Sequence, residues 1–170
     1  MIKSTYLAFL LGALLLGNAP VAHSQSSAII RARYAAIERQ LPQCRVVKRE
    51  LSGYSAEGGE LTAYSQRGEI KKLVARHYGE GGRSTEEFYF WKNQLFFVLI
   101  TDWSYEFPLA SAKTTGRETR TQLRFYFQNE KLTRWVNGNN LTPTPSPEAL
   151  KKRDEVLGFA RDYLGKIRQK

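Results

Sequence analysis

The sequence predicts an α+β domain with an N-terminal helix, an antiparallel β-meander of six or seven strands, and a C-terminal helix packed on the sheet. Apolar residues recur at helical spacing near both ends, and the middle is rich in aromatic and β-branched residues. One hairpin pattern also occurs three times in that middle part. With 170 residues, 42% of them apolar, the chain suits one domain with a buried core.

The N-terminal stretch has the pattern of a cleaved export signal. Lys3 is followed by a short apolar run over 7–16, and the small residues Ala22 and Ser24 precede an expected cut before Gln25. The apolar run falls short of the about 20 residues of a membrane span, which disfavours the alternative of an uncleaved anchor.

The expected organisation is therefore a signal peptide over 1–24 and one domain over 25–170, with no transmembrane segment in the mature chain. Such a protein would reside in a bacterial periplasm or be secreted. The single cysteine, Cys44, excludes a disulfide framework and a multi-cysteine zinc site. We expect a buried, inert thiol, while a reactive thiol or an intermolecular bridge remains open.

The first helix is expected over 28–41, and Pro42 ends it. Its apolar stripe consists of Ile30, Tyr34, Ile37 and Leu41. The sheet is expected over 44–138. A Pro-rich connector over 142–147 leads to a second helix over 147–168, with Ser146 as N-cap and Pro147 at the first helical position.

The repeated hairpin begins with a tyrosine, continues through a polar turn, and has apolar residues six and nine positions after the tyrosine. The three units are Tyr64/Ile70/Leu73, Tyr89/Leu95/Val98 and Tyr126/Leu132/Trp135. Their irregular intervals argue against a solenoid of fixed period.

A three-residue loop in the third hairpin would pair Phe125 with Trp135 and Phe127 with Thr133. Arg124, Tyr126 and Arg134 would then share the opposite face. A two-residue loop would place Arg134 beside Phe125, so the longer loop is preferred.

The central hairpin is apolar on both faces, which predicts that helices or another chain cover both. One face is expected to carry Phe88, Phe90, Phe96 and Val98, and the other Tyr89, Trp91, Leu95, Phe97 and Leu99.

Catalytic motifs are weak. His77 is the one histidine of the mature chain, which excludes a multi-histidine metal site, and no nucleophile motif supports a triad with Asp102. We expect His77 to be a surface or hairpin-end residue. The glycines over 79–82 precede strand residues and not the helix that a phosphate loop requires. No metal or cofactor is predicted.

Asp102 and Glu106 flank Trp103 and Tyr105 on an expected excursion over 102–117. Two acids beside aromatic rings suit a sugar cleft or a glycosidase pair. The competing interpretation, which we favour, is a solvated loop whose aromatic side chains pack back onto the sheet.

Positive charge offers one candidate binding surface. The formal net charge is +10, and Arg120, Arg124, Tyr126 and Arg134 fall on one face of the third hairpin. Arginines beside a tyrosine can hold an anionic glycan, a lipid headgroup or an acidic envelope protein. They are equally typical of the solvated face of an edge hairpin. Export argues against a nucleic-acid partner.

Four stretches resemble a group of small exported bacterial proteins of unknown function: EGGELTAY over 57–64, KLV over 72–74, EFYF over 87–90 and RFYF over 124–127. The hairpin unit also resembles MORN-type repeats, although only the first hairpin has a glycine (Gly68) in its turn. The resemblance implies an exported β-meander and supplies no catalytic residues.

These observations favour an exported, non-enzymatic binding or accessory protein of a bacterial cell envelope. Its binding residues would be Arg120, Arg124, Tyr126, Arg134, Trp103 and Tyr105. One alternative is an inhibitor or immunity protein that blocks an exported enzyme or toxin through the 102–117 excursion. The other is a hydrolase that uses Asp102 and Glu106.

Overall fold

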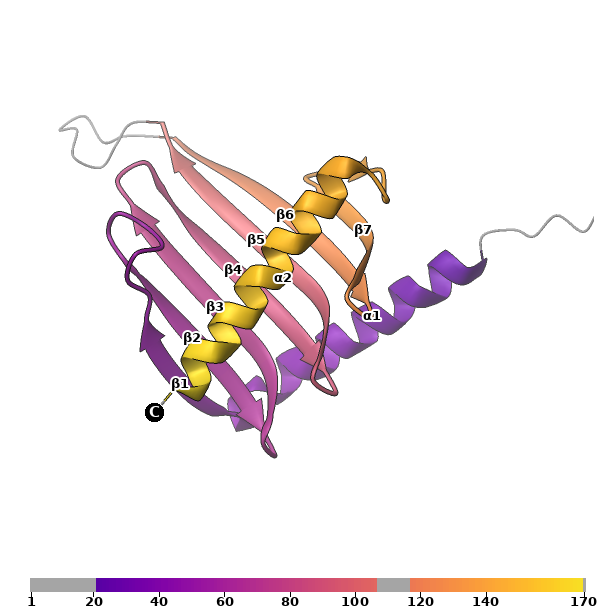
Figure 1. Ribbon diagram of the computed structural model, residues 1–170, viewed down its shortest axis with the longest axis horizontal. Coiled ribbons are helices and arrows are strands. Elements are labelled where there is room, and N and C mark those ends of the chain that lie inside the picture. Colours follow the sequence, from indigo (N-terminus) through magenta and orange to yellow (C-terminus); the bar gives the residue numbers. More distant parts are fainter. Residues whose placement is uncertain (1–20, 107–116, 170) are drawn as a thin grey trace, which may run out of the picture.

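The computed structural model describes residues 21–106 and 117–169 and has three layers, with helix α1 on one face of a single antiparallel sheet and helix α2 on the other (Figure 1). The helices are α1 (Val21–Gln40) and α2 (Pro147–Arg168), and a 3-10 turn, η1 (Leu41–Gln43), follows α1. The strands are β1 (Arg45–Glu50), β2 (Gly59–Gln66), β3 (Glu69–Gly79), β4 (Gly82–Trp91), β5 (Gln94–Tyr105), β6 (Glu118–Gln128), β7 (Lys131–Asn137) and β8 (Asn140–Thr142).

The sheet is a meander, because the spatial order of its eight strands follows the chain and every neighbouring pair is antiparallel. This confirms the predicted α+β class and corrects the expected six or seven strands to eight. The short strand β8 extends the sheet beyond the predicted end at 138. Gly138, at φ +57°, turns the chain back so that Asn140 pairs with Asn137.

The three predicted hairpins share one backbone design. Each closes with a two-residue turn in the left-handed region, at Arg67-Gly68, Lys92-Asn93 and Asn129-Glu130. Each pairing register then shifts directly beside the repeated tyrosine, where a β-bulge inserts one extra residue. The repeat in the sequence is thus a turn with a bulge at a fixed distance.

This bulge corrects the expected three-residue loop. Phe125 does pair with Trp135, but Phe127 pairs with Leu132 and not with Thr133. The extra residue restores the alternation after a two-residue turn, so Arg134 faces away from Phe125. The same bulge in the central hairpin exchanges the expected faces of two residues: Leu95 packs on the α2 side and Phe96 on the α1 side.

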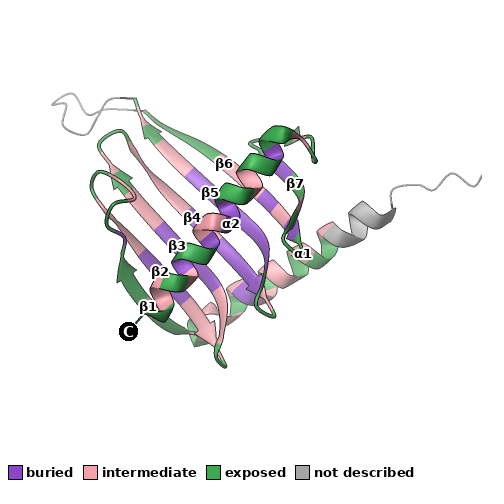
Figure 2. Cartoon of the chain, in the orientation of Figure 1, coloured by how far each residue is buried: buried purple, intermediate pink, exposed green. Residues whose placement is uncertain are grey.

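The larger core lies between the sheet and α2. Five α2 side chains are buried in or against it: Ala149, Val156, Leu157, Ala160 and Tyr163. Ser146 caps the helix as predicted, since its hydroxyl accepts a hydrogen bond from the Ala149 N–H at 3.1 Å. Purple, buried segments accordingly occupy the central strands beneath α2 (Figure 2).

The smaller core lies on the α1 side, around Ile37, Tyr89, Phe96 and Phe97, and the predicted stripe of α1 packs there. Among the described α1 side chains, Ile37 is the one that is fully buried. The helix begins at Val21 and not at the expected position 28, so it includes the last residues of the predicted leader. Cleavage before Gln25 stays a prediction.

Candidate functional site

The predicted binding residues share one face of the sheet, the α1 side of β5, β6 and β7. Trp103 pairs with Arg120, and Tyr126 pairs with Arg134. The Arg134 guanidinium lies 5.4 Å from the centre of the Tyr126 ring, in cation–π geometry. Regular alternation places Arg124 on this face as well.

One arginine of this surface, Arg83, was not predicted from the sequence. Arg83 of β4 pairs with Trp103, and its guanidinium lies 4.7 Å from the Trp103 ring, while that of Arg120 lies 5.8 Å away. Arg83 also donates to the Tyr105 hydroxyl at 3.2 Å and pairs with Glu118 at 2.8 Å. The sequence signal for Arg83 was its place in the strand that immediately precedes the strand of Trp103, because consecutive strands of a meander pair with each other.

These contacts correct the expected excursion over 102–117. Strand β5 continues through Tyr105, so Asp102, Trp103 and Tyr105 belong to the sheet and not to a loop. Residues 107–116 of the expected excursion lie outside the described residues.

The two acids of the hydrolase hypothesis do not share a site with the aromatic rings. Asp102 alternates with Trp103 and faces the α2 side. Glu106 follows four residues later, where its backbone N–H donates to the Arg117 carbonyl at 3.1 Å. Four extended residues separate the two Cα atoms by about 13 Å, and Glu106 lies beyond the end of β5, so the sheet does not hold the pair at the carboxylate separation of about 5–9.5 Å that glycosidases use.

His77 lies near the end of the β3–β4 hairpin, one of the two expected positions, but its side chain is mostly buried and takes part in fixing α2. Its Nε2 lies 3.2 Å from the Tyr163 hydroxyl, which donates to Glu86 at 3.0 Å. Burial, followed by the charge and hydrogen bond of Glu86, raises the pKa of Tyr163 well above its ordinary value. This group joins α2 to β3 and β4.

Cys44 is a free, half-buried thiol whose Sγ lies 3.5 Å from the Gln40 carbonyl. Burial raises its pKa, an effect that the nearby Lys71 charge opposes. A raised pKa reduces the thiolate fraction and so favours the inert role. Within the described ranges, no cluster of His, Cys, Asp or Glu could hold a metal ion.

An ion cluster around the buried Lys72 holds the C-terminal half of α1. The Lys72 ammonium lies 2.8 Å from Glu38 of α1 and 2.6 Å from Glu87, and the Tyr89 hydroxyl donates to Glu38 at 2.8 Å. Burial by itself lowers the pKa of Lys72, but hydrogen bonds and charge from Glu38 and Glu87 outweigh it, so the pKa is raised. The lysine is 7% exposed and was not predicted.

Charge is balanced differently over the two halves of the α1-side face. On β1–β3, Lys48 and Arg76 both pair with Glu60. Around residues 27–34 of α1, none of the guanidinium groups of Arg31, Arg33, Arg124 and Arg134 pairs with a carboxylate of the described residues. We call these four the cleft arginines.

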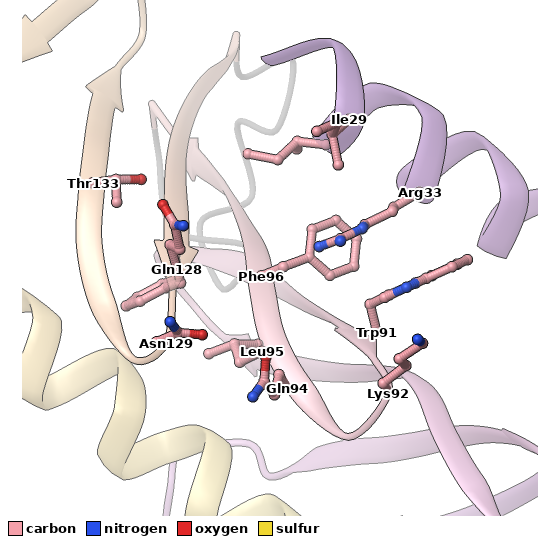
Figure 3. Close-up of a pocket in the computed structure, with 12 residues that line it drawn as sticks. Ile29, Arg33, Trp91, Lys92, Gln94, Leu95, Phe96, Gln128, Asn129 and Thr133 are labelled. Carbon is pink, nitrogen blue, oxygen red and sulfur yellow. The ribbon is translucent and has the colours of Figure 1, made fainter. Parts of the chain in front are cut away.

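The cleft arginines border three hollows between α1 and the sheet. One, of about 310 Å³, is lined by Ile29 and Arg33 of α1 and by Trp91 and Phe96 of the sheet (Figure 3). A second, of about 590 Å³, contains Ser27, Tyr126, Arg134 and Leu141, among others. A third, of about 260 Å³, contains Arg31, Tyr34, Leu99 and Arg124. The N-terminal half of α1 thus overhangs the sheet.

No family model, curated protein or solved structure matches this chain. None of the helices in residues 21–106 and 117–169 is long and apolar enough to cross a membrane.

Proposed function

We propose that this chain is an exported, non-enzymatic binding protein of a bacterial cell envelope, and that it binds an anionic ligand through the cleft arginines. The observation that carries the proposal is the contrast in charge pairing on one sheet face. Lys48 and Arg76 each pair with the Glu60 carboxylate, whereas the four cleft arginines have no carboxylate partner among the described residues.

The surroundings of the cleft arginines suit anion recognition. Arg134 lies over Tyr126, and Arg33 lies 5.5 Å from the centre of the Trp91 ring. Stacking on a ring holds a guanidinium in place while its N–H donors remain available. Export rests on the leader pattern of 1–24, and the non-enzymatic assignment rests on the dispersal of Asp102, Glu106 and His77.

Retention on immobilised heparin, a generic polyanion, tests this proposal. The double variant Arg124→Gln/Arg134→Gln should elute at clearly lower salt than the unmodified protein, because it loses two of the anion contacts. Lys48→Gln/Arg76→Gln is the matched control, since it removes the same net charge from the same face at paired positions.

The control should elute close to the unmodified protein. Equal shifts for the two double variants would mean that net charge alone governs retention, and no shift for either would mean that the cleft arginines bind no anion. Either result overturns the proposal.

The inhibitor alternative depends on a loop that lies mainly outside the described residues. The hydrolase alternative lacks a gathered pair of acids. Neither is favoured by a specific observation.

A further inference from the structure

The three hollows beside α1 form one continuous cleft. Ile30 lines all three, the two largest also share Gln128 and Thr133, and the hollows of about 590 and 260 Å³ share Tyr126. Their individual volumes of about 260–590 Å³ fall near or within the range of about 300–1,000 Å³ that is typical of small-molecule sites.

Apolar and aromatic side chains form much of the inner surface of the cleft, beside polar side chains such as Gln128 and Thr133. Sheet residues Phe96, Phe97 and Leu99 meet Ile30 and Tyr34 of α1 across it. When only water fills the cleft, these apolar side chains stay exposed to it. An acyl chain in the cleft would bury them, and each buried methylene group would contribute about 0.8 kcal/mol of favourable free energy.

The rim of the cleft is basic. Arg31, Arg33, Lys92, Arg124 and Arg134 all line it, whereas none of the described lining residues is acidic, although the chain has 16 Asp and Glu. An apolar interior with a basic rim complements a molecule that has an apolar chain and an anionic head.

Exposed apolar side chains at the openings of the cleft also favour an amphiphilic ligand. Five large hydrophobic residues stand out as exposed in the described part of the chain, and two of them line the cleft. Ile29 is 51% exposed and borders one hollow, while Leu141 is 64% exposed and borders another. A bound acyl chain would cover both of these side chains.

We propose that the cleft between α1 and the sheet binds a single-chain anionic amphiphile, with its acyl chain beneath α1 and its phosphate or carboxylate head on Arg124, Arg134 and Arg31. This inference rests on the proposed function and adds the ligand class to it. Arginine suits both heads, because its planar donors can bind two oxygens at once.

The chain's own leader fits the cleft less well than such a ligand. The apolar run over 7–16 would match the interior, but Lys3 is the charged residue of the leader and would repel the rim. The absence of acidic residues along the lining therefore favours an external anion.

Isothermal titration of the purified protein with dodecyl phosphate, kept below its micelle concentration, tests the inference. We expect one molecule bound per chain. Inorganic phosphate should bind about tenfold or more weakly, because it lacks the chain. Phosphatidylglycerol vesicles form a second arm, in which monomeric dodecyl phosphate should compete with vesicle binding.

Two substitutions should weaken dodecyl phosphate binding by about tenfold or more. Ile30→Trp fills the space common to the three hollows, and Leu141→Asp places a negative charge at one opening. Val46→Asp is the matched control, since Val46 is also exposed, lies in the opposite edge strand and does not line the cleft. Leu141→Asp keeps the test valid if Ile30→Trp fails to fold.

The outcomes separate the ligand class from the proposed function. If dodecyl phosphate binds no better than phosphate, or if Leu141→Asp behaves like Val46→Asp, the cleft inference is wrong even where heparin retention still depends on Arg124 and Arg134. Vesicle binding that the monomer does not displace also overturns it, in favour of a surface contact. Loss of the arginine dependence on heparin overturns the proposed function itself.

Discussion

The two helices cover opposite faces of one sheet in different ways. Helix α2 is anchored along its length, with buried side chains from Ala149 to Tyr163. Helix α1 is anchored at one end by Ile37 and the Lys72–Glu38–Glu87 cluster, while its N-terminal half borders hollows. Helix α2 therefore completes the larger core along its whole length. Helix α1 completes the smaller core at its C-terminal end only, and toward its N-terminal end it forms the wall of a cleft.

The largest expected effect comes from the α2 side of the sheet. Phe90→Ala should lower the free energy of unfolding by about 3–5 kcal/mol, because Phe90 is buried in the core beneath α2 and its removal leaves a cavity. Guanidinium chloride unfolding measures this change. A transition midpoint equal to that of the unmodified protein would contradict the assigned core.

The anchor of α1 should contribute less. Lys72→Met leaves Glu38 and Glu87 without their cation, and we expect a loss of about 1–3 kcal/mol, since both carboxylates retain some contact with water. Urea unfolding gives the value. The far-ultraviolet helix signal should also fall, because α1 loses its main polar attachment, whereas a variant as stable and as helical as the original would refute this role.

The tyrosine hydroxyls of both anchors predict alkaline instability. Burial raises the pKa of Tyr89 and Tyr163 in the folded state above the value of about 10 in the unfolded chain. The folded protein therefore retains these protons more tightly. The resulting stability is fully present below pH of about 10 and is lost as pH rises through the folded-state pKa.

Tyr163→Phe checks this prediction. At neutral pH the variant should lose about 1 kcal/mol with the hydrogen bond to Glu86. Above pH of about 10 its stability should fall less steeply than that of the unmodified protein, measured by unfolding at a series of pH values. Parallel curves for the two proteins would contradict the assignment.

The smallest effect is expected at the cleft arginines. Arg124 donates to the neutral acceptors Gln122 and Gly138, so Arg124→Ala should change stability by no more than about 0.5 kcal/mol. Thermal unfolding measures this. A large loss would show that the residue supports the fold, which would weaken its assignment to binding.

The sequence predicts much of this architecture because its signals are local. The tyrosine-to-aliphatic spacing identifies three hairpins, and the α1 stripe identifies the residues that meet Tyr89 and Phe97. The bulge in the central hairpin was not predictable from hydrophobicity, because Leu95 and Phe96 are both apolar and either can face either core. The short strand β8 was missed because Asn and Gly dominate its turn and leave only Leu141 as an apolar signal.

The candidate site shows the same division. Alternation places Arg124, Tyr126 and Arg134 on one face, and the register confirms this. The cleft depends on how far the N-terminal half of α1 stands from the sheet, which no local spacing specifies. The Lys72 cluster depends on the pairing of β3 with β4 and on the docking of α1, which the sequence does not specify. The one signal was that Lys72 precedes Leu73 and Val74 in an apolar strand, where a buried lysine requires a carboxylate partner.

Hydrogen–deuterium exchange with and without dodecyl phosphate tests whether α1 forms the wall of a ligand cleft while α2 belongs to the core. We expect amides over 28–34 of α1 to exchange faster than those of buried α2 segments, and we expect the ligand to protect them while leaving α2 unchanged. Equal exchange along both helices, or ligand protection that is spread over α2 and absent from α1, would contradict this assignment of the two helices.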